Sequence, residues 1–331
     1  MPSATLDAPV EIQELMKKDN ARPDTTDSTA SDPDLENPFS APKVNNLATE
    51  SLDKHEVFAL GPYCPPSEKT TFMPAKAGET NWSRIEGKKN KPSVIFDTDD
   101  RTLFLPENYP WRCIGKVRTA GGWGSGTIIG PRHVLTASHC VNWNPDGSAG
   151  WITFTPGYFD GRGTPGELTV NEIISWVKNP HFLTDLQVAF DYVVLITDVR
   201  IGETLGYAGA RSYDSAWNNQ ALFQYLGYPA EISRGERPAI QNNATISTKE
   251  DHTLDGNQGC ALGNFNDFTP GDSGGPCWAF WANEPGPSVV GVGSIIGSTN
   301  VVHPGSSRDD NDYGGGPALL KIVNWARLNR A

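Results

Sequence analysis

A serine between glycines carries the most chemical information in the sequence. The segment Gly271–Pro276 reads Gly-Asp-Ser-Gly-Gly-Pro, and such a turn presents the Ser273 hydroxyl as a nucleophile beside exposed backbone N–H groups. The segment also fits Gly-x-Ser-x-Gly, the nucleophile elbow of α/β-hydrolases, in which the acid and the histidine follow the serine. Only 58 residues follow Ser273, and His303 is the one histidine among them. That stretch is too short to complete an α/β-hydrolase sheet, so we disfavour an esterase on that fold.

The groups that such a serine needs lie upstream. His139 stands in Thr-Ala-Ser-His-Cys, and Asp191 follows it by 52 residues and opens the apolar run Tyr192–Leu195. A histidine takes the proton as the hydroxyl attacks a carbonyl, and a carboxylate fixes the tautomer of that histidine. Either residue alone would more often be structural, but the order His139, Asp191, Ser273 with these flanks predicts a catalytic triad. The backbone N–H groups of Gly271 and Ser273 would then form the oxyanion hole.

In the order and the flanks of these residues, the sequence resembles the chymotrypsin-like serine peptidases, and within them the V8-like (glutamyl endopeptidase-like) members of fungi and bacteria. The second resemblance rests on Val94–Arg101 (Val-Ile-Phe-Asp-Thr-Asp-Asp-Arg), Tyr109–Arg112 (Tyr-Pro-Trp-Arg) and Leu226–Pro229 (Leu-Gly-Tyr-Pro). It covers residues 94–331. It implies a serine endopeptidase that hydrolyses polypeptide substrates through an acyl-enzyme, with no metal and no organic cofactor. A non-catalytic binding or regulatory protein on the same fold is the alternative, and labelling by a fluorophosphonate would separate the two.

Four positions bear on substrate binding in the resembled family. Ser294 matches the serine that hydrogen-bonds the catalytic aspartate and lines the substrate groove. Asp267, six residues before the nucleophile, matches the aspartate that binds Arg or Lys in trypsin-like members. Gly293 stands where glutamyl endopeptidases carry a histidine that reads the substrate carboxylate, and Phe268 would narrow the pocket. Cleavage after Arg or Lys, after Glu, or after a small or apolar residue is therefore open at this point.

The resemblance also implies activation by processing. Val94 begins the family-like region, and Asp272 immediately precedes the nucleophile. In trypsin-like members the matching aspartate pairs with a freed N-terminal amine and so orders the oxyanion hole. We therefore predict that residues 1–93 are a pro-segment whose removal lets the amine of Val94 enter the second barrel. An inert tail, with Val94 in an ordinary strand, is the alternative.

Short strands must position these residues. The sequence has 34 glycines and 26 prolines, a composition that suits many strands joined by tight turns. Apolar runs predict the strands Trp111–Val117, Gly124–Ile129, His133–Thr136, Trp151–Thr155, Glu167–Val177 and Phe190–Thr197 before residue 200, and Ala221–Gly227, Ile240–Ser247, Gly259–Leu262, Pro276–Trp281 and Val289–Ile296 after it.

These strands and the resemblance together predict an all-β fold of two six-stranded antiparallel β-barrels. The first barrel would span residues 94–200 and the second residues 201–312. Leu319, Ile322, Val323 and Ala326 repeat at helical spacing and predict a C-terminal helix within 313–331. Residues 1–93 have the polar, proline-rich composition of a largely disordered extension.

Charge and cysteine content limit the partners and the compartment. The net charge of −12 and the pI near 4.9 argue against nucleic acid and anionic membrane as partners, and no apolar run approaches the roughly 20 residues of a membrane span. The first twenty residues contain no stretch of signal-peptide type. The five cysteines nevertheless favour a secreted protein, with Cys113–Cys140 and Cys260–Cys277 as candidate disulfides and Cys64 left over. No Cys-x-x-Cys pair predicts a zinc site, and we expect a monomer.

Overall fold

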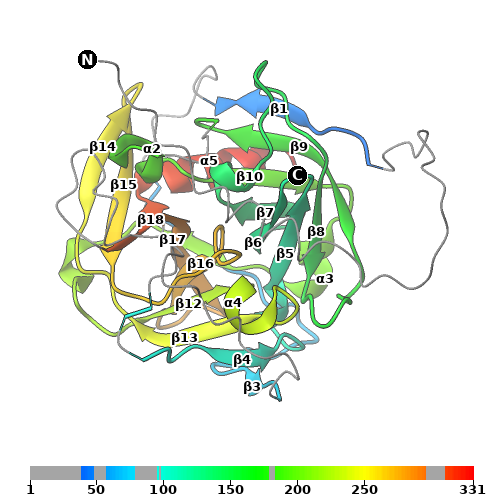
Figure 1. Ribbon diagram of the computed structural model, residues 1–331, viewed down its shortest axis with the longest axis vertical. Coiled ribbons are helices and arrows are strands. Elements are labelled where there is room, and N and C mark those ends of the chain that lie inside the picture. The colour runs from blue at the N-terminus through cyan, green and yellow to red at the C-terminus, as the bar shows by residue number, and fades with distance from the viewer. Residues whose placement is uncertain (1–38, 48–56, 79–94, 97, 179–182, 296–309) are drawn as a thin grey trace.

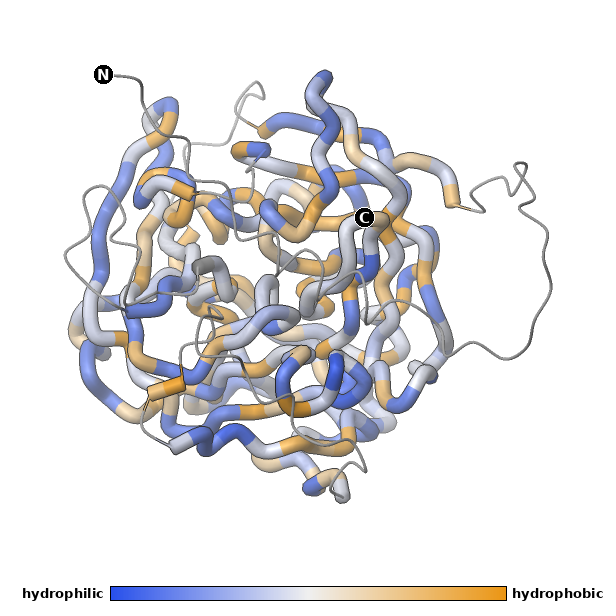
Figure 2. Tube along the Cα trace, viewed as in Figure 1, coloured by the Kyte–Doolittle hydropathy of each residue, from blue (hydrophilic) through white to orange (hydrophobic). Residues whose placement is uncertain are grey.

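The fold consists of two β-sheets that lie side by side (Figure 1). The computed structural model describes residues 39–47, 57–78, 95–96, 98–178, 183–295 and 310–331. Hydrophobic residues gather in the interior, whereas hydrophilic residues follow the outer turns and the outer hairpin strand β14 (Figure 2). All eleven predicted strands have a counterpart in the structure, so the predicted all-β class is confirmed.

The first half is a closed barrel of six strands, as predicted. Its strands are β5 (Ile114–Thr119), β6 (Gly122–Gly130), β7 (His133–Thr136), β8 (Ile152–Pro156), β9 (Leu168–Ser175) and β10 (Val193–Thr197), and pairing of β8 with β9 closes the ring. Strand β10 is buried on both faces. Val193 and Leu195 point into the barrel core, and Val194 and Ile196 belong to the cluster shared with the C-terminal helix, as the period of two along a strand requires.

The second half is an open sheet of eleven strands, which differs from the predicted six-stranded barrel. Its main strands are β12 (Phe223–Gly227), β13 (Ala239–Ala244), β14 (Glu250–Leu254), β15 (Asn257–Asn264), β16 (Pro276–Phe280), β17 (Pro287–Ile295) and β18 (Asn311–Gly315). Strand β14 pairs with β15, and β13 pairs with β12 and β4 (Thr102–Leu105), so no described pairing of β13 with β14 closes a ring. The polar strand β14 and the glycine-rich strand β18 lack an apolar run and were not predicted.

The predicted domain boundaries need correction at three places. Strand β4, which lies within 94–200, pairs with β13 and belongs to the second sheet. Strand β18 crosses the boundary at residue 312. The range 1–93 contains β1 (Lys43–Asn46), β2 (Ala59–Leu60) and β3 (Ala75–Lys76), which pair with β9, with β11 (Gly209–Arg211) and with β4. Backbone pairing to a sheet edge does not require an apolar segment, and composition therefore did not reveal these strands.

Short helices connect the strands, and one longer helix ends the chain. The short ones are α2 (Asp185–Ala189), α3 (Ile201–Leu205) and α4 (Ala230–Ser233), with 3₁₀ turns η2 (Trp111–Cys113), η3 (Ser138–Cys140) and η4 (Ser215–Trp217). Helix α5 (Pro317–Asn329) confirms the predicted C-terminal helix, and its four periodic apolar side chains are fully buried. His133 and Trp176 of the first half contact the carbonyls of Ala326 and Ala318, which fixes α5 against the barrel.

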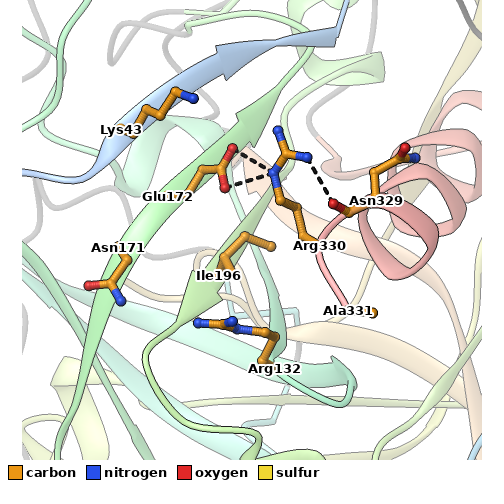
Figure 3. A pocket seen from close by; sticks show the side chains of 8 residues that line it. All are labelled: Lys43, Arg132, Asn171, Glu172, Ile196, Asn329, Arg330 and Ala331. Atoms are coloured by element: carbon orange, nitrogen blue, oxygen red, sulfur yellow. Dashed lines mark hydrogen bonds and ion pairs between the residues drawn. The ribbon is translucent and has the colours of Figure 1, made fainter.

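A carboxylate joins the N-terminal strand, the barrel and the C-terminus. Glu172 on β9 accepts hydrogen bonds from Arg330 Nε at 2.9 and 2.8 Å (Figure 3). It also accepts one from the Asn45 side chain of β1. Glu172 and Arg330 line a surface cavity, and Lys43 and Arg132 line it as well. Because Asn45 and Arg330 come from opposite ends of the chain, the N-terminal strand is part of the folded unit.

We predict that Leu47→Ala destabilises the protein by about 2–5 kcal/mol. Leu47 directly follows β1, its side chain is fully buried, and it lies in the cluster that contains Ile174 and Trp176. Urea unfolding followed by circular dichroism measures the effect as a lower midpoint. Val199→Ala, at an exposed position, is the control and should leave the midpoint unchanged. Equal midpoints for the two variants would mean that the N-terminal segment does not pack against the barrel.

Candidate active site

The turn that bears Ser273 lies between β15 and β16 and leaves no room for a side chain at Gly271 or Gly274. Gly271 and Gly274 have φ angles of +96° and +83°, a region that favours glycine. A Cβ atom on Gly274 would lie 2.2 Å from Thr136 Oγ1, and one on Gly271 would lie 2.3 Å from the carbonyl of Tyr228. Both glycines are therefore required, and the turn lies directly against the segment that leads to His139.

Ser125 on β6 holds this turn to the first barrel. Its backbone N–H donates to the carbonyl of Ser273 at 2.7 Å, and its Oγ donates to the carbonyl of Gly271 at 2.8 Å. Its Oγ also accepts from the N–H of Tyr228 at 2.8 Å. The Ser125 side chain is fully buried. One residue of the first half thus fixes the carbonyl groups on both sides of Asp272 and, with them, the direction of the turn.

His139, in η3 after β7, and Asp191, just before β10, lie side by side. Nδ1 of His139 lies 2.6 Å from Asp191 Oδ2, and the His139 backbone N–H donates to Asp191 Oδ1 at 3.0 Å. Ser294 Oγ donates to Asp191 Oδ2 at 2.6 Å. The Asp191 side chain is fully buried, and helix α2, capped by the side chains of Thr184 and Gln187, ends just before it. The carboxylate therefore has one fixed orientation toward the imidazole.

The neighbourhood of His139 favours the protonated imidazole. Burial by itself lowers the pKa of His139, but the Asp191 carboxylate, together with the Cys140 thiol, raises it well above its usual value of 6.5. The net direction is upward because Asp191 is fully buried and only 2.6 Å away. An imidazole in this position can accept a proton from a nucleophile and hold it as an imidazolium, which is the behaviour that a general base requires.

The N–H groups of Gly271 and Ser273 are available to a ligand. Within the described residues neither donates a hydrogen bond, whereas the N–H groups of Asp272, Gly274 and Gly275 donate to carbonyls. Among the described residues, the hydrogen bonds of the His139 ring are with Asp191 and Cys140; a bond between a catalytic serine and histidine often tightens only when substrate binds. The site can therefore provide a hydroxyl nucleophile, a base and two N–H groups that are free to donate.

Asp267, which was predicted to bind substrate, forms its hydrogen bonds within the protein instead. Both carboxylate oxygens of Asp267 accept backbone N–H groups, from Phe96 at 2.9 Å and from Asp100 at 3.3 Å, and the residue is 1% exposed. Burial raises the pKa of Asp267, and these two N–H groups oppose that rise. The carboxylate thus faces the segment before β4. Asp267 is engaged within the protein.

Gly293 faces two aromatic rings. A Cβ atom at this position would lie 2.4 Å from Tyr225 Oη and 2.7 Å from the ring of Phe268. The rings of Tyr225 and Phe268 stack with centroids 5.1 Å apart and an interplanar angle of 15°. The volume that a side chain at residue 293 would use is therefore filled.

Asp272 is paired with an arginine. Its Oδ2 accepts from Arg101 Nη1 at 3.0 Å, and both side chains are 2% exposed. The carboxylate that was expected to bind a freed N-terminal amine therefore has a guanidinium partner in the intact chain. Val94 lies outside the described residues, and its role stays a prediction.

The five cysteines are all described and all free, so neither predicted disulfide is present. Cys113 Sγ lies near the carbonyls of Leu205 and Gly206, and Cys260 Sγ donates to Asp251 Oδ1 at 3.0 Å. Cys140 Sγ lies 3.6 Å from the Ser273 carbonyl and 3.9 Å from His139 Nε2.

Sequence reasoning gave no role to Ser125 or Arg101. Arg101 was noticed only as part of the motif Val94–Arg101, and the one cue for Ser125 is its glycine-flanked position in Trp-Gly-Ser-Gly.

The described residues contain no cluster of His, Cys, Asp and Glu that could hold a metal ion. In the same part of the chain no helix is both long and apolar enough to cross a membrane.

The chain is similar to several known proteins. The Trypsin family profile matches residues 105–306, more than half of the chain. A glutamyl endopeptidase of Bacillus licheniformis is 27% identical over 267 residues, which are 75% of this chain and 76% of that protein. An extracellular metalloprotease of Bacillus subtilis is 25% identical over 155 residues, 44% of this chain and 48% of that protein. A solved structure of Glu endopeptidase in complex with MPD, 23% identical, has a TM-score of 0.54 and covers 71% of this chain and 100% of its own. That likeness shows the fold.

We predict that Asp191→Asn lowers turnover by about 10⁴-fold, the scale known for loss of the orienting carboxylate. The variant should also move the acidic limb of the profile of kcat/KM against pH to lower pH. His139 must be neutral to act as a base, and without the carboxylate that raises its pKa, protonation sets in only at lower pH. The profile of the residual hydrolysis measures the shift. An acidic limb that does not move would contradict the pairing.

Proposed function

Because the chain belongs to the trypsin family of serine peptidases, we propose that it is a serine endopeptidase that uses Ser273, His139 and Asp191. The observation that carries the proposal is the contact between the barrel and the turn of the second sheet that bears Ser273. The His139–Asp191 pair, with Nδ1 and Oδ2 2.6 Å apart, comes from the barrel, and the Ser273 turn from the second sheet is held against it by Ser125. A protein that only binds would not need this arrangement.

The proposed mechanism assigns one step to each of these groups. Ser273 Oγ attacks the carbonyl carbon of the scissile bond while its proton moves to His139 Nε2. The carbonyl oxygen becomes an oxyanion that the N–H groups of Gly271 and Ser273 stabilise. His139 then gives the proton to the leaving amine, which departs and leaves an acyl-enzyme. A water molecule, deprotonated by His139, hydrolyses the ester and restores Ser273.

We propose that the enzyme selects an uncharged, small or apolar residue on the amino side of the cleaved bond. Asp267, the candidate partner for Arg or Lys, is buried and bonded to Phe96 and Asp100. Gly293, the candidate position for a glutamate-reading histidine, faces the rings of Tyr225 and Phe268. The name of the Bacillus licheniformis relative describes that protein, and the described part of this chain offers no cation at the matching position.

Processing and location complete the proposal. Removal of residues 1–93 ahead of Val94 stays a prediction, which N-terminal sequencing of the active form would test. We propose that the protein acts outside the cell on polypeptides, as a monomer. The support for the location is indirect: a relative is named an extracellular enzyme, and the net charge of −12 suits a soluble acidic protein.

We predict that Ser273→Ala lowers peptidase turnover by several orders of magnitude and removes labelling by a fluorophosphonate. His139→Ala should cost about as much, and the double variant should be barely worse than either single one, because the residues act as a unit. Hydrolysis of an unstructured protein substrate measures turnover, and a circular dichroism spectrum controls for folding. Activity retained by pure Ser273→Ala would contradict the proposal and favour another catalytic group.

We predict that Asp267→Asn leaves the cleavage preference unchanged, because the carboxylate faces Phe96 and Asp100. Digestion of a peptide library, read by mass spectrometry, gives the preference of wild type and variant. Asp160→Asn is the matched control, because it changes a carboxylate that pairs with Arg237 and not with the segment before β4. Cleavage after Arg or Lys in wild type that disappears in Asp267→Asn, but not in the control, would place Asp267 in the pocket after all.

A further inference from the structure

Arg101 is a buried cation beneath the nucleophile turn. Its Nη1 donates to Asp272 Oδ2 at 3.0 Å and to Thr269 Oγ1 at 2.9 Å. Nε and Nη2 both reach the carboxylate of Asp99 at 3.0 Å, and Glu231 lies 3.7 Å from Nη2. Burial by itself lowers the pKa of Arg101, but the carboxylates of Asp99 and Asp272 raise it above its usual value. The guanidinium therefore stays charged.

Asp272 is fixed at both its side chain and its backbone. Besides Arg101, the carboxylate accepts the N–H and the hydroxyl of Thr269 at 3.0 and 3.1 Å. Its carbonyl accepts from the N–H of Gly275 at 2.9 Å and from the hydroxyl of Tyr225 at 2.8 Å. Asp272 lies between Gly271 and Ser273, whose N–H groups would form the oxyanion hole. The orientation of those two groups therefore depends on how Asp272 is held.

The segment before β4 binds the loop 267–272 at both of its ends. Phe96 and Asp100 donate their N–H groups to Asp267, and Arg101 pairs with Asp272. Burial raises the pKa of Asp272 to about 6, while Arg101 and Thr269 oppose the rise. A buried carboxylate that loses its cation is strongly destabilising, so loss of Arg101 would disturb the turn before it disturbed distant parts of the fold.

We propose that Arg101 is the positioning residue that holds the oxyanion-binding turn through Asp272, and that the intact chain is catalytically competent without a freed N-terminal amine. This inference rests on the proposed function. It follows from occupancy: the site on Asp272 that an ammonium would use is filled by a guanidinium from within the chain. Any removal of the N-terminal segment would then serve a purpose other than forming the oxyanion hole.

The first test compares Arg101→Gln with Arg101→Gln/Asp272→Asn in the full chain. The single variant leaves a buried carboxylate unpaired and should lose about 100-fold or more in kcat, the scale of one oxyanion donor, with KM nearly unchanged. The double variant also removes the charge of Asp272, whereas the lost contacts of Arg101 with Asp99 and Glu231 are common to both variants. It should therefore regain at least about tenfold of that loss. Rates are expressed per folded molecule, measured by circular dichroism, so that simple unfolding does not imitate the effect.

Arg237→Gln is the matched control, because Arg237 pairs with Asp160 away from the turn, and it should keep the wild-type kcat. A kcat of Arg101→Gln equal to wild type would overturn the proposal. If the single variant does not fold, the double variant decides: a folded and labelled double variant supports the charge-pair role, and a double variant that is folded but not labelled overturns it.

The second test asks which form of the wild-type chain reacts. Freshly purified protein is labelled with a fluorescent fluorophosphonate, separated by size and identified by mass spectrometry, with Ser273→Ala as the blank. The proposal expects label on the intact 331-residue chain. Label only on chains shortened from the N-terminus would overturn it and leave the proposed peptidase function standing. No label on either form would instead contradict the proposed function itself.

Discussion

The proposed catalytic centre depends on one constraint: its nucleophile and its base belong to different halves of the molecule, which must be held in a single register. Ser125 meets this constraint with a backbone and a side-chain hydrogen bond to the carbonyls of Ser273 and Gly271. Gly274 adds a close approach to Thr136, where no side chain would fit. Because a slip of one residue along β6 would turn Ser125 to the opposite face, the register of the barrel and the position of the nucleophile are fixed together.

Two buried carboxylates close to the nucleophile have different tasks because their neighbours differ. Asp191 faces His139 and the hydroxyl of Ser294, so its charge acts on an imidazole that can gain and lose a proton. Asp272 faces the guanidinium of Arg101, which does not release its proton, so its charge acts on the position of the backbone. Burial makes both interactions strong, and a missing partner costly. In the proposed mechanism, buried negative charge thus supports proton transfer on one side of the turn and rigidity on the other.

Local signals in the sequence predicted much of the fold and the core of the site. The apolar runs marked eleven strands, and the spacing of Leu319, Ile322 and Val323 marked α5. The order of histidine, aspartate and serine led to the triad that we propose, and His139 and Asp191 do lie in contact. The remainder depends on contacts that no local pattern encodes. Arg101 and Asp272 are 171 positions apart. The direction in which the Asp267 carboxylate points is set by the N–H groups of Phe96 and Asp100. Strands β1 to β3 pair through backbone hydrogen bonds, which do not depend on side-chain type and so leave no sequence pattern.

Two glycines near the site, Gly124 and Gly293, have surroundings that leave no room for a side chain. At Gly124 a Cβ atom would lie 2.7 Å from Cys140 Sγ and 2.9 Å from the carbonyl oxygen of Ser273. This space is therefore filled, and the Cys140 thiol is free beside His139. At Gly293 the space is occupied by Tyr225 and Phe268, so a histidine could enter only if two stacked, buried rings moved. Overpacking of this kind strains a core. A side chain at either glycine would require its neighbours to move, which supports our proposal that the substrate preference differs from the one named for the Bacillus licheniformis relative.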